Sequence, residues 1–163
     1  MLIGVVSDTH NNLKNIKRII EIFNHHKVSS VIHTGDIVNA KSLESFSKLN
    51  CQLFGVYGNN DRYETDLRDI TERYNFCFQE PPKFIKLSNK NIAIFHEPDD
   101  IESYLPHNGN IDIVLHGHTH RYRNEMKDGV LFFNPGESAG MQRGSNAVGI
   151  VDLNNLMAKR IFF

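Results

Sequence analysis

The first structured element predicted along the chain is Leu2-Ile3-Gly4-Val5-Val6-Ser7-Asp8-Thr9-His10, an apolar run that ends in polar residues. Leu2 to Val6 are apolar and mostly β-branched, which is the pattern of a strand that is buried on both faces. A carboxylate and an imidazole follow directly, where such a strand would end. The stretch therefore predicts a buried strand whose carboxyl end carries Asp8 and His10.

The same pattern recurs twice in the first half of the chain. The expected elements that follow are a helix with an apolar face from Leu13 to Phe23, capped by Asn11 or Asn12, a strand from Ser30 to Thr34, a helix from Lys41 to Leu49 and a strand from Gln52 to Tyr57. The second strand stops at Gly35-Asp36 and the third at Gly58-Asn59-Asn60-Asp61. Alternating strands and helices imply right-handed crossovers and a mainly parallel sheet, in which ligands bind at the carboxyl ends of the strands.

The second half of the chain changes to hairpins. A helix is expected from Glu64 to Tyr74, followed by a break at Pro81-Pro82 and a hairpin of Phe84–Leu87 and Ile92–Phe95 with its turn at Asn89-Lys90. A short helix from Asp100 to Leu105 and a strand from Ile111 to Leu115 come next. Two further hairpins are expected, Arg123–Lys127 with Val130–Phe133 and Ala147–Leu153 with Met157–Phe162. The strand ending at Phe95 runs into His96, and the strand ending at Leu115 runs into His116-Gly117-His118-Thr119-His120. We expect a second sheet stacked on the first, with helices outside, in a single domain spanning residues 1–163.

Composition narrows the class of protein. The 163 residues suit one domain, and the formal net charge of −1 creates no global positive field that would favour nucleic acid or an anionic membrane as a partner. Cys51 and Cys77 form no Cys-x-x-Cys motif, so we expect buried thiols in a reducing compartment. Because neither a signal peptide nor an apolar run of about 20 residues is recognisable, we expect a cytoplasmic protein without a membrane partner.

Several metal-ligating side chains fall at the expected strand ends. They are oxygen and imidazole donors without a thiolate: Asp8, His10, Asp36, Asn59, His96, His118 and His120. Such a set suits manganese, iron, zinc or a similar divalent ion and disfavours a structural zinc site of the cysteine type. The set is too large for one metal, whereas two metals that share a bridging carboxylate would use all of it. Two metals about 3.5–4 Å apart are the recognised arrangement for displacement at phosphorus.

Each cluster has a simpler interpretation when taken alone. Asp8-Thr9-His10 would be a helix cap with a stray histidine, and Gly35-Asp36 and Gly58-Asn59-Asn60-Asp61 are good turn sequences. His96 alone would be a core histidine. The coincidence favours the metal site, because every cluster falls at the end of an expected strand.

Taken in order, Asp8-Thr9-His10, Gly35-Asp36, Gly58-Asn59-Asn60-Asp61, His96 and Gly117-His118-Thr119-His120 resemble the motifs of the calcineurin-like metallophosphoesterase superfamily. The length and the Asn134-Pro135-Gly136 turn are similar to those of its small prokaryotic phosphodiesterase branch. The resemblance covers essentially the whole chain and rests on a highly specific combination. It implies an α/β fold, a four-layer α/β/β/α sandwich of two mixed β-sheets flanked by helices, with a dinuclear metal site between the sheets.

The resemblance also implies a role for each donor. The first metal would be held by Asp8, His10, Asp36 and His120, and the second by Asp36, Asn59, His96 and His118. Asp36 would bridge them, and a hydroxide shared by the two divalent ions would attack phosphorus. We expect manganese, with nickel, iron, zinc and cobalt as alternatives. His116 is left outside the ligand set.

Two positions depart from the family pattern. Many members have a histidine where this chain has Asn60, placed to protonate the leaving group and oriented by the aspartate that is Asp61 here. Asn60 and Asp61 are therefore the expected catalytic residues, with Asn60 donating a hydrogen bond to a phosphate oxygen and Asp61 supporting the site. Glu97 stands where the family usually has glycine. It opens an acidic segment, residues 97–102, that would repel polyanions if it overhangs the cleft.

These observations favour a phosphodiesterase or phosphatase that acts on a small phosphate ester. A non-catalytic scaffold is the alternative from another class, because the retromer subunit of the same fold serves as a protein-interaction platform. A nuclease is disfavoured by the near-neutral charge and by the minimal length, although Arg62, Arg121, Arg123 and Arg143 lie near expected site loops. A homo-oligomer is left open.

Overall fold

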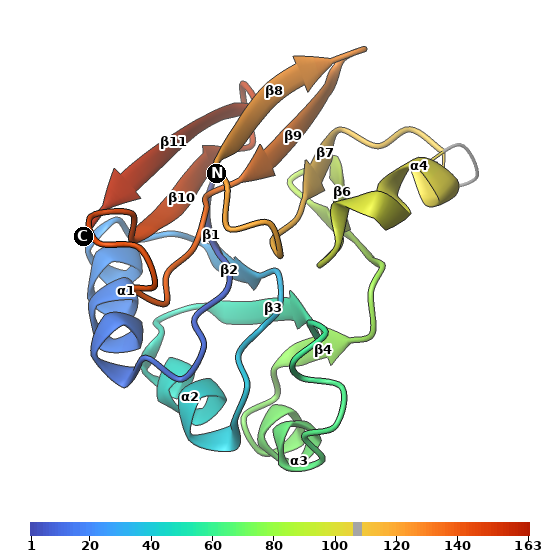
Figure 1. Cartoon of the computed structure of the whole chain (residues 1–163). Helices are drawn as coiled ribbons and strands as arrows, with labels where there is room; N and C mark the ends of the chain where they lie inside the picture. Colours follow the sequence, from blue (N-terminus) through green and yellow to red (C-terminus); the bar gives the residue numbers. More distant parts are fainter. Residues whose placement is uncertain (106–108) are drawn as a thin grey trace.

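The computed structural model describes residues 1–105 and 109–163 and contains two stacked sheets (Figure 1). The first has six strands in the order β11-β10-β1-β2-β3-β4. Their bounds are Leu2–Val6 (β1), Ser30–His33 (β2), Gln52–Val56 (β3), Cys77–Gln79 (β4), Ala147–Asp152 (β10) and Met157–Phe162 (β11). β1 to β4 run parallel, and the antiparallel hairpin of β10 and β11 extends the sheet beside β1.

The second sheet has five strands in the order β5-β6-β7-β9-β8. Their bounds are Lys83–Leu87 (β5), Lys90–Ile94 (β6), Ile113–Leu115 (β7), Arg123–Lys127 (β8) and Val130–Asn134 (β9). β6, β7 and β9 are parallel to one another, and β5 and β8 are antiparallel at the two edges. The parallel centre of this sheet brings the ends of β6 and β7, and the histidines that follow them, to the same edge.

Helices lie on the outer faces of both sheets, and apolar side chains fill each interface between layers. On the first sheet lie α1 (Leu13–His25), α2 (Ala40–Ser45), a 3₁₀ turn (Phe46–Lys48) and α3 (Asp66–Arg73), and on the second a 3₁₀ turn (Pro98–Asp100) and α4 (Ile101–Tyr104). Ile16 of α1 packs in one cluster with Val31 of β2, and Ile101 of α4 packs with Phe95. Between the sheets, Ile3, Leu115 and their neighbours form the central cluster. These layers confirm the predicted α/β/β/α sandwich.

Local differences from the expected elements have local causes. β4 was not expected, because three residues next to Asn75 and Pro81 show no periodicity and become a strand only by pairing with β3. β7 starts at Ile113 rather than Ile111, since the Asp112 carboxylate accepts hydrogen bonds from the Asn91 N–H (2.8 Å) and Lys90 Nζ (3.0 Å). The expected helix over residues 41–49 tightens into a 3₁₀ turn after Ser45.

The cysteines correct one further expectation. Cys51 and Cys77 are free, but they are only half-buried, because Cys51 precedes β3 and Cys77 lies on the edge strand β4. Among the described residues, no helix is both long enough and apolar enough to cross a membrane.

Candidate metal centre

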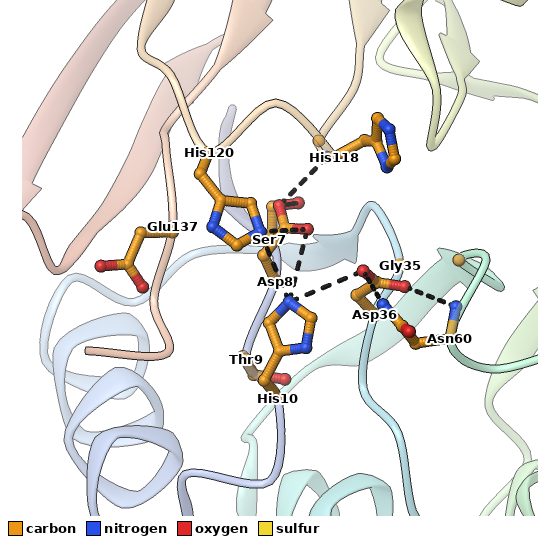
Figure 2. Close-up of polar contacts among 12 residues, drawn as sticks. Ser7, Asp8, Thr9, His10, Gly35, Asp36, Asn60, His118, His120 and Glu137 are labelled. Atoms are coloured by element: carbon orange, nitrogen blue, oxygen red, sulfur yellow. Dashed lines mark hydrogen bonds and ion pairs between the residues drawn. The ribbon is translucent and has the colours of Figure 1, made fainter. Parts of the chain in front are cut away.

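The loops that follow β1, β2, β3, β6 and β7 carry the predicted donors, and each donor lies close to at least one other. In one group, His120 Nε2 lies 3.4 Å from Asp8 Oδ1 and 3.4 Å from His10 Nε2, and His10 Nε2 lies 4.0 Å from Asp8 Oδ1. Figure 2 shows the three side chains pointing toward one another. The Asp8 side chain is fully buried, so its charge lies in a place where only specific partners can offset the cost of desolvation.

The second group forms around His96. Its Nδ1 lies 2.8 Å from the Thr34 carbonyl oxygen, so the Nδ1–H donates there and Nε2 faces the site. That Nε2 lies 2.9 Å from Asn59 Oδ1 and 3.5 Å from Asp36 Oδ1. His118 Nδ1 lies 3.1 Å from the same Asn59 oxygen. Asn59 Oδ1 thus lies within 3.1 Å of a ring nitrogen of each of these two histidines.

Asp36 lies between the two groups. Its Oδ2 is 3.6 Å from His10 Nε2, and its Oδ1 is 3.5 Å from His96 Nε2. Asn60 donates to Asp36 twice, from the backbone N–H to Oδ1 (3.0 Å) and from Nδ2 to Oδ2 (2.8 Å; Figure 2). Burial by itself would raise the pKa of Asp36, but the bonds from His96 and Asn60 outweigh it and hold that pKa well below its usual range. Asp36 is therefore a carboxylate at neutral pH.

The backbone is strained where the donors are attached. Left-handed conformations, which side chains other than glycine rarely adopt, occur at Asp8 (φ 52°), His10 (φ 37°), Asp36 (φ 59°), His118 (φ 64°) and His120 (φ 55°). Each such residue costs about 1–3 kcal/mol, and strain of this kind concentrates at functional sites. The concentration of strain in these loops supports a functional role that ordinary turns would not need.

Glycines in the motifs make room for the carboxylates. A Cβ at Gly58 would overlap Asp36 Oδ1, and a Cβ at Gly117 would overlap the Ser7 hydroxyl and lie 2.9 Å from Asp8 Oδ2. Ser7 donates to Asp8 Oδ2, and the His118 N–H donates to the same oxygen at 3.2 Å. Any larger residue at either glycine would displace a donor oxygen.

Asp61 anchors the loop that carries Asp36. Its Oδ2 accepts the N–H groups of Asp36 (2.9 Å) and Gly58 (2.7 Å), and its Oδ1 accepts those of Ile37 (2.9 Å) and Val38 (2.7 Å). Burial raises the pKa of Asp61, although these N–H bonds oppose the shift. Asp61 contacts backbone on every side, which suits a residue that positions the site.

Replacing Asp61 with asparagine is expected to destabilise the metal-free protein by about 2–6 kcal/mol, because an amide nitrogen would face two buried N–H donors and leave both unpaired. Urea unfolding with EDTA present measures the change. Asp69→Asn, on α3, is the control. A loss below about 1 kcal/mol for Asp61→Asn would contradict this role.

Several supporting residues were not recognised from the sequence. Glu137 is buried, accepts N–H groups from Gly140 (2.8 Å), Gln142 (3.2 Å) and Met141 (3.4 Å), and lies beside His120 (Figure 2). The Asp8 carboxylate beside the ring raises the pKa of His120, and the charge of Glu137 adds to that shift. The one available signal for Glu137 was its place directly after the Asn134-Pro135-Gly136 turn.

Asn134 and His116 support the histidine loop from behind. Asn134 Nδ2 donates to the Gly117 carbonyl (3.1 Å) and to Thr119 Oγ1 (3.3 Å), and it lies 3.4 Å from His116 Nδ1. Burial lowers the pKa of His116 to about 4. His116 is buried, and its Nδ1 lies 3.3 Å from the Gly117 carbonyl oxygen.

His33 gives the protein a predictable response to acid. Burial lowers its pKa to about 3, and its Nδ1 accepts the Gly35 N–H (3.1 Å), so the ring is neutral. Between pH 6.5 and pH 3 the unfolded chain binds a proton at His33 that the folded chain does not, so this residue alone lowers the free energy of unfolding by about 1.4 kcal/mol for each pH unit of acidification. Urea unfolding of the metal-free protein at pH 7 and pH 5 measures this slope. Replacing His33 with asparagine should make it shallower, and equal slopes would contradict the assignment.

The donors fit divalent metal ions. One atom from each of Asp8, His10 and His120 lies within 4.8 Å of the others, and the same holds for Asp8, Asp36 and His96. Asp8 Oδ1 is buried and has no hydrogen-bond partner among the described residues. An unpaired buried carboxylate oxygen is costly, and a cation would offset that cost. Carboxylates and imidazoles without thiolates are the ligands expected for such ions.

The acidic segment and the arginines take varied positions. Asp99, Asp100 and Glu102 are exposed, whereas Glu97 pairs with Arg62 (3.2 Å). Arg123 pairs with Glu125 (2.8 Å) and lies over the Phe132 ring, on the outer side of the second sheet.

Comparisons with known proteins agree with this fold. A model of the calcineurin-like phosphoesterase superfamily domain matches residues 1–156. The chain is 38% identical over 160 residues to phosphodiesterase MJ0936 of Methanocaldococcus jannaschii, covering 93% of each protein. It is 24% identical over 168 residues to phosphodiesterase YfcE of Escherichia coli, covering 95% of this chain and 88% of that one.

Solved structures give the same answer. An archaeal phosphodiesterase superposes with a TM-score of 0.91 and 33% identity over 100% of both chains. Vps29 of Entamoeba histolytica superposes with a TM-score of 0.70 over 99% of both, but at 17% identity this likeness supports the fold alone. The fold and the site define a metal-dependent phosphoesterase, a hydrolase. The chain belongs to the calcineurin-like phosphoesterase superfamily, as its motifs predicted.

Proposed function

We propose that the protein hydrolyses a small phosphodiester with the help of two divalent metal ions, manganese first among them. The observation that carries the proposal is the position of Asp36, whose two oxygens face His10 on one side and His96 on the other. Asp36 would bridge the ions. The first ion would also be held by Asp8, His10 and His120, and the second by Asn59, His96 and His118.

The residues around the site have separable tasks in this proposal. Bound metal ions supply hydroxide at neutral pH, by lowering the pKa of water from 15.7 to about 7, and draw charge from the phosphate oxygens. Thr34 fixes the ring of His96 by accepting its Nδ1–H. Asp61 holds the loop on which Asp36 is carried, and the exposed Asn60 amide lies beside Asp36, within reach of a phosphate oxygen on the open side. Asn60 and Asp61 therefore act by orientation.

The substrate class and setting are also part of the proposal. The near-neutral charge supports a small ester over nucleic acid, and residues 1–163 would act as one cytoplasmic domain. Phosphomonoesters are the second candidate substrate class, because the donor set suits both.

A metal-supplemented assay tests the proposal. Purified protein is stripped with EDTA, reloaded with Mn²⁺, Ni²⁺, Co²⁺, Zn²⁺ or Mg²⁺, and offered bis(4-nitrophenyl) phosphate and 4-nitrophenyl phosphate. Metal-dependent release of nitrophenol from the diester is the expected result. If no metal restores hydrolysis of either ester, a scaffold that has lost catalysis would replace the enzyme.

Substitutions of the two histidines in the Gly117-His118-Thr119-His120 motif should affect the two ions selectively. Replacing His120 with alanine is expected to weaken binding of the ion held by Asp8 and His10. Replacing His118 with alanine is expected to weaken binding of the other ion, and each loss of affinity should be at least about 100-fold. Calorimetric titration with Mn²⁺ measures both sites, and His116→Gln, which removes no predicted ligand, should weaken neither site selectively. Equal weakening of both sites by either substitution would refute the division.

A further inference from the structure

An ion pair joins the loops that carry the second group of donors. Arg62 follows Asp61 in the loop after β3, and Glu97 follows His96 in the loop after β6. Arg62 Nη2 lies 3.2 Å from Glu97 Oε1, so the contact connects the first sheet to the second. Both side chains remain accessible, at 51% for Arg62 and 31% for Glu97.

The pair lies close to the donors because of its place in the chain. Neighbouring Cα atoms are about 3.8 Å apart, so the Cα of Arg62 lies within about 7.6 Å of that of Asn60, and the Cα of Glu97 lies about 3.8 Å from that of His96. Asn60 contacts Asp36, and His96 contacts Asn59. A phosphate ester seated on the donors would thus lie within reach of the long arginine side chain.

We propose that Arg62 binds the phosphate group of the substrate, and that Glu97 sets the preference for a monoanionic diester by competing for the Arg62 guanidinium. The inference rests on the proposed phosphoesterase function. It adds a specificity pair outside the predicted metal ligands.

The charges explain the direction of the preference. A guanidinium carries five N–H donors in a planar fork that suits phosphate, and the bond to Glu97 leaves most of them free. Near neutral pH a phosphodiester carries one negative charge, whereas a phosphomonoester carries nearly two, because its second pKa is about 6. Glu97 therefore disfavours the monoester more strongly, because it neutralises part of the Arg62 charge that a dianion would otherwise use.

The test compares the two esters in the metal-loaded enzyme at pH 8. Glu97→Gln removes one negative charge and should raise the ratio of kcat/KM for 4-nitrophenyl phosphate over that for bis(4-nitrophenyl) phosphate by about two- to fivefold, with less effect in high salt. Glu21→Gln is the matched control, since Glu21 also pairs with an arginine (Arg18, 3.1 Å) but on the outer helix α1. An unchanged ratio in Glu97→Gln would overturn the proposal.

A double-mutant cycle separates competition for Arg62 from a simple effect of charge. Arg62→Gln should lower kcat/KM for both esters, and more for the monoester. In the Arg62→Gln background, Glu97→Gln should lose most of its effect on the ratio of kcat/KM values. If the effects of the two substitutions are additive instead, Glu97 does not act by competing for Arg62. Failure of the proposed function itself is distinguishable, because the wild-type enzyme would then hydrolyse neither ester.

Discussion

Replacing Asp36 with asparagine is expected to lower kcat/KM for bis(4-nitrophenyl) phosphate by at least about a thousandfold. One oxygen of Asp36 lies 3.6 Å from His10 Nε2, and the other lies 3.5 Å from His96 Nε2. An amide keeps the shape but removes the negative charge and presents a nitrogen to one of the two sites. Removing one hydrogen-bond donor that stabilises a transition state typically lowers kcat by about a hundred- to a thousandfold. Losing the charge of a carboxylate that is proposed to bridge both ions should lower the rate further.

The measurement needs three readouts to be decisive. Steady-state rates in excess Mn²⁺ give the loss of activity, metal content after gel filtration gives the loss of binding, and circular dichroism shows whether the fold persists. Asp69→Asn, an exposed change on α3, should match wild type in all three. Activity within tenfold of wild type in Asp36→Asn would mean that the bridging assignment is wrong, or that a contaminating enzyme supplies the rate.

The first half of the fold was predictable because each signal was local. β1, β2 and β3 are short apolar runs, and the apolar face at Ile16, Ile19 and Phe23 needs only helical spacing to be recognised. β4 was not predictable, because it is a strand only through its pairing with β3. Element types followed from periodicity, whereas strands defined by long-range contacts did not.

The donors were predictable, and the structures that support them were not. Asp8, Asp36 and His96 are visible in the sequence because each follows a strand. The bonds that Asp61 accepts from the N–H groups of residues 36–38, and the pairing of Arg62 with Glu97, join residues 23–35 positions apart, so no sequence spacing indicates them. Left-handed backbone at residues such as His118 is equally hidden, because only glycine and asparagine are usual there. The ligand assignment and the single-domain boundary remain predictions.

A leaving-group series should reveal the consequence of Asn60. An amide has no ionisable proton to give, so a departing alkoxide would leave without the proton that a histidine could donate. Wild-type kcat/KM should therefore fall steeply as the leaving-group pKa rises, from nitrophenyl to phenyl to alkyl diesters of methyl phosphate. A flat series would show that another group protonates the leaving oxygen.

Asn60→His should restore this step for poor leaving groups. General acid catalysis contributes about a hundred- to ten-thousandfold, so an alkyl diester should gain at least about a hundredfold while a nitrophenyl diester changes little. The new imidazole should also add a limb to the pH–rate profile near its ordinary pKa of about 6.5. Asn154→His, in the turn between β10 and β11, controls for an added histidine.

The Asn60 side chain donates to Asp36 at 2.8 Å, so a histidine there that bound Asp36 instead of the leaving group would lower all rates equally. A uniform loss across the series would therefore place residue 60 with the ligands, and a selective gain would place it with the leaving group.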